Sequence, residues 1–372
     1  MGTRDHGTGR GAVLAASAAA AVVAAAWLAA APVGPARDDG PPAVVPASGD
    51  EVLERLPAGA SRAAAQARAL RAGASAGARQ ELEAAVALAA LHLRQARADG
   101  DAREAGRAQA ALGAWWDRAD APPEVVLMRA AIRQHQHAFD ASLRELDALT
   151  DRLPDERGAW WLKAAVLQTT GRLAQARAAC ERVAALGEPG DAAPLVCLAE
   201  LASLRGDAAE ASALLARLGP RPMPAAELAW IRLVLAQIAE RAGRDDEAER
   251  LYRLAHRGAA GPYSRVAHAD LLLARDRPAD ALALLADAPD TDAVLVLRAI
   301  ATGRLGDPSA AALADALRSR FEAARERAAE GASGETTGHL REAARFALDV
   351  ERDAGAALER ARDNWAVQKE PA

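Results

Sequence analysis

Alanine and leucine supply most of the apolar positions along the chain, and no stretch shows the sustained apolar–polar alternation of a half-buried strand. Alanine is the strongest helix former and leucine is close behind it. Hydrophobic residues make up 51% of the 372 residues, but aromatic residues only 3%, so the usual strand formers Ile, Thr, Tyr and Phe are scarce. The pattern therefore predicts an all-α protein.

The helical pattern also repeats. The segment LMRAAIRQHQHAFDASLRELDALTDRLP matches GAWWLKAAVLQTTGRLAQARAACERVAAL, with Ala130 in the place of Ala164 and Ser142 in the place of Ala176. The residues that take the place of Gly171 in other copies are Gly100, Gly206, Gly243, Asp276 and Gly306. Internal similarity at a fixed period predicts a solenoid, in which each repeat stacks on its neighbours.

These copies resemble the tetratricopeptide repeat, most closely in the copy that begins at Ala159, with its Trp160, small Ala164, Gly171 and small Ala176. The resemblance covers about residues 80–372 in about eight degenerate copies, and it implies a right-handed α-solenoid of tandem helix-turn-helix repeats. The two alanines then let helices approach closely where they cross. Gly171 is expected in a left-handed turn, and Trp160 is expected to bury about 200 Å² between its small neighbours.

The N-terminus carries Arg4 and Arg10 before an uncharged run over residues 11–31, with small Gly34 and Ala36 beyond it. This order predicts a signal peptide over residues 1–36, or an uncleaved membrane anchor, since the run is long enough to span a bilayer. Prolines predict an extended linker over residues 37–57. The solenoid is then expected over residues 58–372, exported to the periplasm or anchored to the membrane, with membrane contact only through residues 11–31.

A net charge of −5 argues against a nucleic-acid-binding surface, which usually carries a basic excess. Cys180 and Cys197 lack the spacing of a metal or redox motif. They are interpreted as two free buried thiols, and a disulfide between neighbouring helices is the alternative, open only to a protein in an oxidising compartment.

The sequence contains no glycine-rich phosphate loop, zinc-protease helix or nucleophile elbow. The histidines considered as metal ligands, and interpreted instead as isolated or surface residues, are His92, His135, His137, His256, His268 and His339. Asp245, Asp246, Glu247 and Glu249 are interpreted as solvated acids that favour a helix N-terminus. We therefore expect a protein that is not an enzyme and needs no cofactor or metal. A small-ligand or metal-handling enzyme is the alternative.

The resemblance also implies a binding surface, because the first helices of successive tetratricopeptide repeats line a concave groove that holds a partner's peptide or helix. The groove positions assigned in this way, together with Ala131, Ala165 and Val266, are Leu127, Gln134, Trp161, Gln168, Val196, Glu200, Trp230, Leu233, Gln237, Tyr263 and Asp270. Exposed aromatic residues are frequent binding hot spots. The alternative is that Trp161 and Trp230 belong to the core and that the register is shifted.

The expected function is therefore a protein–protein interaction scaffold that binds an unidentified protein or peptide. Chaperone-type carboxylate clamps use asparagines on these helices, and Asn364, outside the groove positions, is the chain's one asparagine, which disfavours that class. The family usually has a further capping helix where this sequence stops. A structural self-assembler that stacks through an uncapped last helix pair is therefore the alternative function.

Overall fold

The computed structural model describes residues 66–67, 78–99, 102–188, 191–218, 223–256, 261–329 and 340–369. The expected signal or anchor over residues 1–36, the linker over 37–57 and the turn at Gly100 lie outside these ranges. Within them, no helix combines the length and the apolar character needed to cross a membrane.

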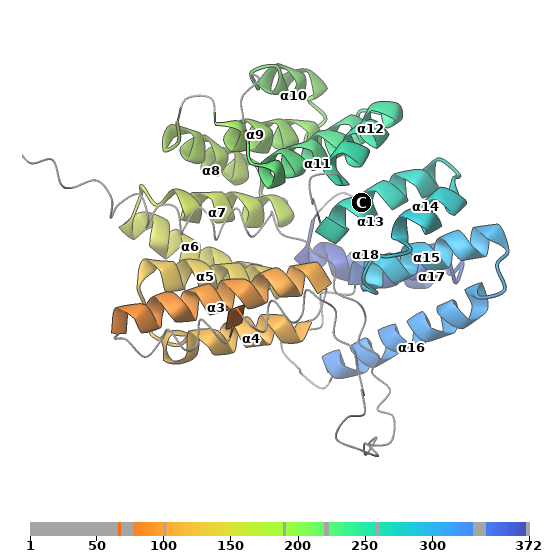
Figure 1. The fold of residues 1–372 in the computed structure, drawn as a ribbon, viewed down its shortest axis with the longest axis horizontal. Helices are drawn as coiled ribbons and strands as arrows, with labels where there is room; N and C mark the ends of the chain where they lie inside the picture. The colour runs from red at the N-terminus through yellow and green to blue at the C-terminus, as the bar shows by residue number, and fades with distance from the viewer. Residues whose placement is uncertain are drawn as a thin grey trace, which may run out of the picture.

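The described ranges contain eight successive helix pairs and no strand, so the expected all-α solenoid of helix-turn-helix units is confirmed (Figure 1). A short 3₁₀ helix, η2 (Gly113–Trp115), follows the first pair. The pairs are α3 (Ala78–Asp99) with α4 (Ala102–Leu112), α5 (Pro123–His135) with α6 (Phe139–Arg152), α7 (Arg157–Thr169) with α8 (Leu173–Ala185), α9 (Ala192–Leu204) with α10 (Ala208–Leu215), α11 (Ala225–Arg241) with α12 (Asp245–His256), α13 (Gly261–Ala274) with α14 (Pro278–Leu285), α15 (Asp292–Leu305) with α16 (Ala310–Ala329), and α17 (Leu340–Asp349) with α18 (Ala354–Val367).

Several helices begin at residues that satisfy the free backbone N–H groups of a first turn. The Asp207 carboxylate accepts a hydrogen bond from the Glu210 N–H at 2.8 Å, and that of Asp353 accepts one from the Ala356 N–H at 2.9 Å. Pro123 and Pro278 stand at the starts of α5 and α14, where a missing N–H costs nothing. The helix boundaries are therefore set locally.

The turn inside seven of the pairs is made by a residue with positive φ. The residues in this left-handed conformation are His137, Gly171, Gly206, Gly243, Asp276, Gly306 and Arg352. Gly171 has φ +72°, as expected from its place in the repeat. His137, Gly171, Gly206, Gly243 and Asp276 each lie two residues after the first helix and two before the second, so this turn residue gives a register for comparing those pairs.

Small residues lie where the two helices of a pair cross. Ala164 and Ala176 are both buried, as expected. In the preceding pair Ser142 is buried too, and its hydroxyl donates to the Ala130 carbonyl at 2.8 Å. Trp160 differs from the expectation. It is only half-buried, because its indole N–H reaches outward to the Pro154 carbonyl at 2.8 Å.

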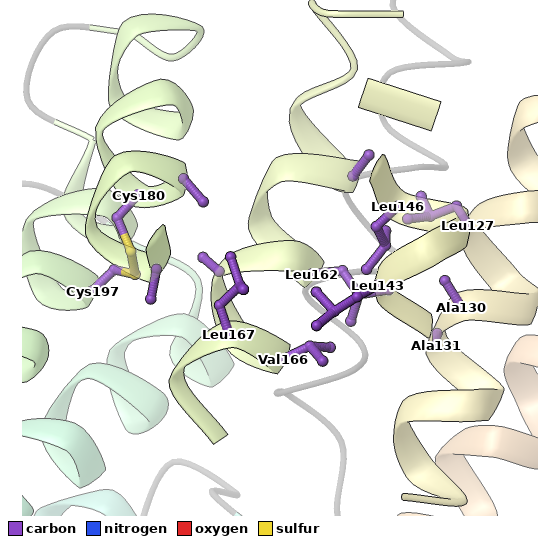
Figure 2. Packing of buried hydrophobic residues seen from close by; sticks show 14 of the residues in the cluster. Leu127, Ala130, Ala131, Leu143, Leu146, Leu162, Val166, Leu167, Cys180 and Cys197 are labelled. Carbon is purple, nitrogen blue, oxygen red and sulfur yellow. A yellow bond between two sulfur atoms is a disulfide. The ribbon is translucent and has the colours of Figure 1, made fainter. Parts of the chain in front are cut away.

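The largest apolar cluster runs continuously from α3 to α11. Figure 2 shows leucine and valine side chains of α5, α6 and α7 meeting within it, and the disulfide of Cys180 and Cys197 between α8 and α9. The interpretation of the two cysteines as free thiols is therefore wrong. Antiparallel packing of α8 on α9 brings their Cα atoms to 6.2 Å, within the range that a disulfide bridges.

The helix pairs curve round so that the eighth pair returns to the middle of the molecule. Figure 1 shows α17 behind α15 and α18 extending from there toward the stack of α3 to α8. Phe346 of α17 packs in a second apolar cluster with α13 to α16, and Val367 at the end of α18 packs against the first cluster. The eighth pair therefore joins the first apolar cluster to the second.

Candidate functional site

Five of the expected groove residues are buried and offer no surface to a partner. The five are Leu127, Ala131, Val196, Trp230 and Leu233, each at most 7% exposed, so their assignment to an accessible groove is wrong. The physical reason is that first helices are covered on several sides. α9 packs against α8, α10 and α11, and nine of its thirteen residues are buried.

The turn residues also correct the register. Trp161 lies ten positions before its turn residue Gly171, and Leu233 lies ten positions before Gly243. Leu233, not Trp230, is therefore the equivalent of Trp161. The expected positions on α11 and α13 lie about one helical turn further from their turn residues, Gly243 and Asp276, than those on α7 lie from Gly171. The alternative, that Trp161 and Trp230 both belong to the core, holds for Trp230 alone, since Trp161 is half-buried.

Trp161 and Trp230 meet edge to face, with ring centroids 5.8 Å apart. Trp161 is half-buried on α7 and Trp230 is buried on α11. The third and fifth helix pairs therefore touch at this point. The two indoles fill the inner side of the curve there. An occupant of the inner face must therefore bind beside the tryptophans rather than between them.

Five polar residues among the expected positions form what we call the inner polar set: Gln134, Gln168, Glu200, Gln237 and Asp270 on α5, α7, α9, α11 and α13. All five are half-buried. Gln134 accepts a hydrogen bond from Arg97 at 3.2 Å, and Gln237 donates one to the Tyr263 hydroxyl at 3.1 Å. Tyr263 is 53% exposed, which makes it an accessible aromatic residue beside this set.

The last pair and the segment that follows it contact one member of the inner polar set and the neighbour of another. Arg345 of α17 makes a bidentate ion pair with Asp270, with both oxygens 2.5 Å from a guanidinium nitrogen. The Lys369 N–H donates to the carbonyl of Thr169, the neighbour of Gln168, at 2.8 Å. Sequence reasoning missed these contacts, because nothing in the spacing of the repeats shows that the eighth pair returns to the third.

Several titratable residues interpreted as surface groups are buried. His92 is 8% exposed and lies 2.7 Å from the Glu104 carboxylate. Burial lowers the pKa of His135 to about 3, with Arg97 adding to the effect. Glu249 is 6% exposed and pairs with Arg253, Arg275 and Arg277. The surface interpretation is therefore wrong for His92 and Glu249, which neighbouring helices cover, whereas His135 is half-buried.

A second buried histidine group joins α12 to α13. His256 Nε2 lies 3.0 Å from His268 Nδ1, and His256 Nδ1 lies 3.0 Å from the buried Ser264 hydroxyl. Burial lowers the pKa of both histidines to about 4, so they are neutral at pH 7. The serine is too buried to meet a substrate. In the described part of the chain, no group of three or more His, Cys, Asp and Glu residues is placed to hold a metal ion. His339 lies outside it.

No protein-family model matches the chain, and neither does any curated protein. Among solved structures, it is similar to a tetratricopeptide repeat protein from Parabacteroides merdae, with 16% identity over 63% of this chain and 93% of that one, at a TM-score of 0.42. It is also similar to a chain of the APC/C hetero-tetramer Cut9–Hcn1, with 13% identity over 80% of this chain and 58% of that one, again at a TM-score of 0.42. The helix-pair architecture described above rests on the chain's own helices.

Proposed function

We propose that the protein is a non-enzymatic scaffold that holds a segment of a partner protein against the inner polar set and Tyr263. The observation that carries this proposal is that segments of the chain itself already bind there. The carbonyl of Thr169, next to Gln168, accepts a hydrogen bond from the backbone N–H of Lys369. The carboxylate of Asp270 accepts two from the Arg345 guanidinium. The surface thus accepts a backbone N–H and a basic side chain, the donors that an extended peptide with an arginine offers.

The geometry favours binding because these side chains are held before a partner arrives. Gln237 and Tyr263 are joined by a hydrogen bond, and each side chain of the inner polar set is half-buried on a packed helix. Little conformational entropy is then lost on association. The exposed ring of Tyr263 supplies an aromatic contact of the kind that dominates interface energies.

A site-specific crosslinker tests the proposal. A photoreactive amino acid would replace Gln237 or Tyr263 in the native host, and Arg250, exposed on the outer helix α12, would be the matched control position. We expect the two inner positions to crosslink one and the same partner and the control position not to. Equal crosslinking from all three positions, or none from the inner two, contradicts the proposal.

The scaffold is further proposed to act outside the cytoplasm, at the cell envelope. The charged start, apolar run and small residues of the first 36 positions support export. The disulfide of Cys180 and Cys197 supports it independently, because such bonds persist in oxidising compartments. Alkylation of free thiols in intact cells before lysis, followed by peptide mapping, should find both cysteines oxidised. A reduced pair in living cells contradicts this location.

Self-assembly through the eighth pair is a second candidate, favoured by its exposed apolar residues. Leu348, Leu358 and Trp365 are 51%, 52% and 56% exposed. Light scattering at increasing protein concentration, for the wild type and for a Leu358→Glu variant, distinguishes self-assembly from binding of a different partner. Concentration-dependent growth that the variant abolishes supports self-assembly, and a constant monomer mass excludes it.

A further inference from the structure

An arginine-rich pocket of about 390 Å³ lies beside α6, among residues that include none of the inner polar set. Its walls come from three elements. Ala119 follows η2, Arg129 and Arg133 come from α5, and Arg144, Glu145 and Arg152 come from α6. Pockets of this volume are typical of small-ligand sites.

The charges in the pocket do not balance. Its lining holds four guanidinium groups and one carboxylate. Glu145 is shared by Arg129, at 3.0 Å from its Nε, and by Arg133. Arg144 and Arg152 form no ion pair with any residue of the described ranges. One carboxylate therefore faces four cations.

The acids nearest to Arg144 on α6 do not correct this imbalance. Asp140 is held by Arg172 and Asp147 by Lys163, each at 2.8 Å. Asp151, the remaining aspartate of α6, is not among the lining residues. An excess of positive charge thus gathers at one place on a chain whose net charge is −5.

The wall opposite α6 is rigid. Arg129 is 7% exposed, and its Nη1 donates to the carbonyls of Trp116 at 2.8 Å and Arg118 at 2.9 Å. These two bonds fix the segment after η2 against α5. The Arg133 guanidinium also lies over the Trp116 ring, 5.3 Å from its centroid.

Room for a ligand is left by short side chains. Ala141 and Ala148 of α6 and Ala119 line the pocket between the arginines. Arg144 and Arg152 are exposed one turn before and one turn after Ala148, so their side chains can reach toward a ligand from both ends of the pocket. A guanidinium matches the oxygens of a carboxylate or phosphate with two parallel hydrogen bonds.

We propose that this pocket binds a small ligand that carries two or more oxyanion groups. Arg129 and Arg133 form its fixed positive floor with Glu145, and Arg144 and Arg152 supply the two groups that engage the ligand. Phosphate esters and polycarboxylates share this chemistry. The site is independent of the partner surface proposed above, since the two share no residue.

Isothermal titration of the purified full chain at low salt tests the site, with pyrophosphate and citrate as separate probes. The test variant is Arg144→Gln with Arg152→Gln. The matched control is Arg250→Gln with Arg362→Gln, which removes the same charge from two exposed arginines elsewhere. None of the four arginines forms an ion pair within the described ranges, so both variants should fold, as circular dichroism would verify.

We expect saturable binding of one molecule per chain, weakened about tenfold or more in the test variant and unchanged in the control, since each guanidinium–oxyanion contact is a charge-assisted bond. Binding of pyrophosphate alone assigns the site to phosphate esters, and binding of citrate alone assigns it to polycarboxylates. Absence of saturable binding by the wild type overturns the proposal. An equal loss in both variants also overturns it, because general charge screening would then explain the binding.

Discussion

His256 and His268 are a buried neutral pair whose environment opposes protonation. Tyr252 stacks on His268 with ring centroids 5.5 Å apart. Burial is the largest cause of each lowered pKa. Neighbouring charges add to it, through His268 and Arg265 at His256 and through Arg253 and Arg277 at His268, while Glu249 opposes it at His268. The folded protein therefore resists a proton that the unfolded chain accepts near pH 6.5.

The free energy of unfolding should consequently fall as pH falls from about 6.5 to about 4. His256 and His268 lie 3.0 Å apart and titrate as a coupled pair, so the loss by pH 5 is of the order of 2 kcal/mol for the first proton that the pair binds. Urea unfolding at pH 7.5 and pH 5, in the wild type and in a His256→Gln, His268→Gln variant, measures it. Carboxylates and His135 titrate in both proteins. The contribution of His256 and His268 is therefore the part of the pH dependence that the wild type shows and the variant does not. Equal pH dependence in the two proteins contradicts the assignment.

The disulfide of Cys180 and Cys197 closes a short loop, with a sequence separation of 17. Removing such a crosslink frees the unfolded chain, and a loop of this size corresponds to about 3 kcal/mol. A Cys180→Ala, Cys197→Ala variant should lose about this much stability in denaturant unfolding at pH 7. The wild type in reducing agent should lose a similar amount, and unchanged stability in both would contradict a structural role.

At the scale of the helix pair, the left-handed turn residue provides a test of local backbone strain. Gly206 has φ +80°, and a Cβ there meets nothing within 4 Å, so only backbone strain opposes a side chain. Gly206→Ala should cost about 1 kcal/mol. Arg352, exposed with φ +60°, carries that strain already, and Arg352→Gly should stabilise by about 0.5 kcal/mol. Thermal unfolding of both variants checks these opposite signs, and shifts of the same sign would contradict the explanation.

The helix pairs and their turns could be predicted from the sequence because they depend on neighbouring residues. Ala164, Ala176 and Gly171 behave as their spacing indicated. The burial of Trp230 and the pairing of Asp270 could not be predicted in this way. Both depend on how tightly successive pairs curve, which sums many small rotations between pairs and leaves no mark at one position.

At the scale of the whole molecule, the ion pair of Arg345 with Asp270 and the packing of Val367 hold the eighth pair against the rest. Arg345→Ala together with Val367→Ser should raise the radius of gyration in small-angle scattering, while helix content stays the same. The ion pair alone contributes about 1 kcal/mol, because both side chains remain about a third exposed. Arg362→Ala, at an exposed site on α18, is the control, and an unchanged radius in the double variant contradicts the closing role.

The return of the eighth pair to the third also bears on how the molecule folds. Helix arrays held only by contacts between neighbours can open one segment at a time. The bond from Lys369 to Thr169 joins distant parts of the chain, so an opening of the third pair near this bond also disturbs the eighth. During synthesis the early pairs can form as they emerge, but they gain this support only after α18 has been made. Cooperative unfolding of the whole array thus depends on residues that the ribosome adds long after it has made the third pair.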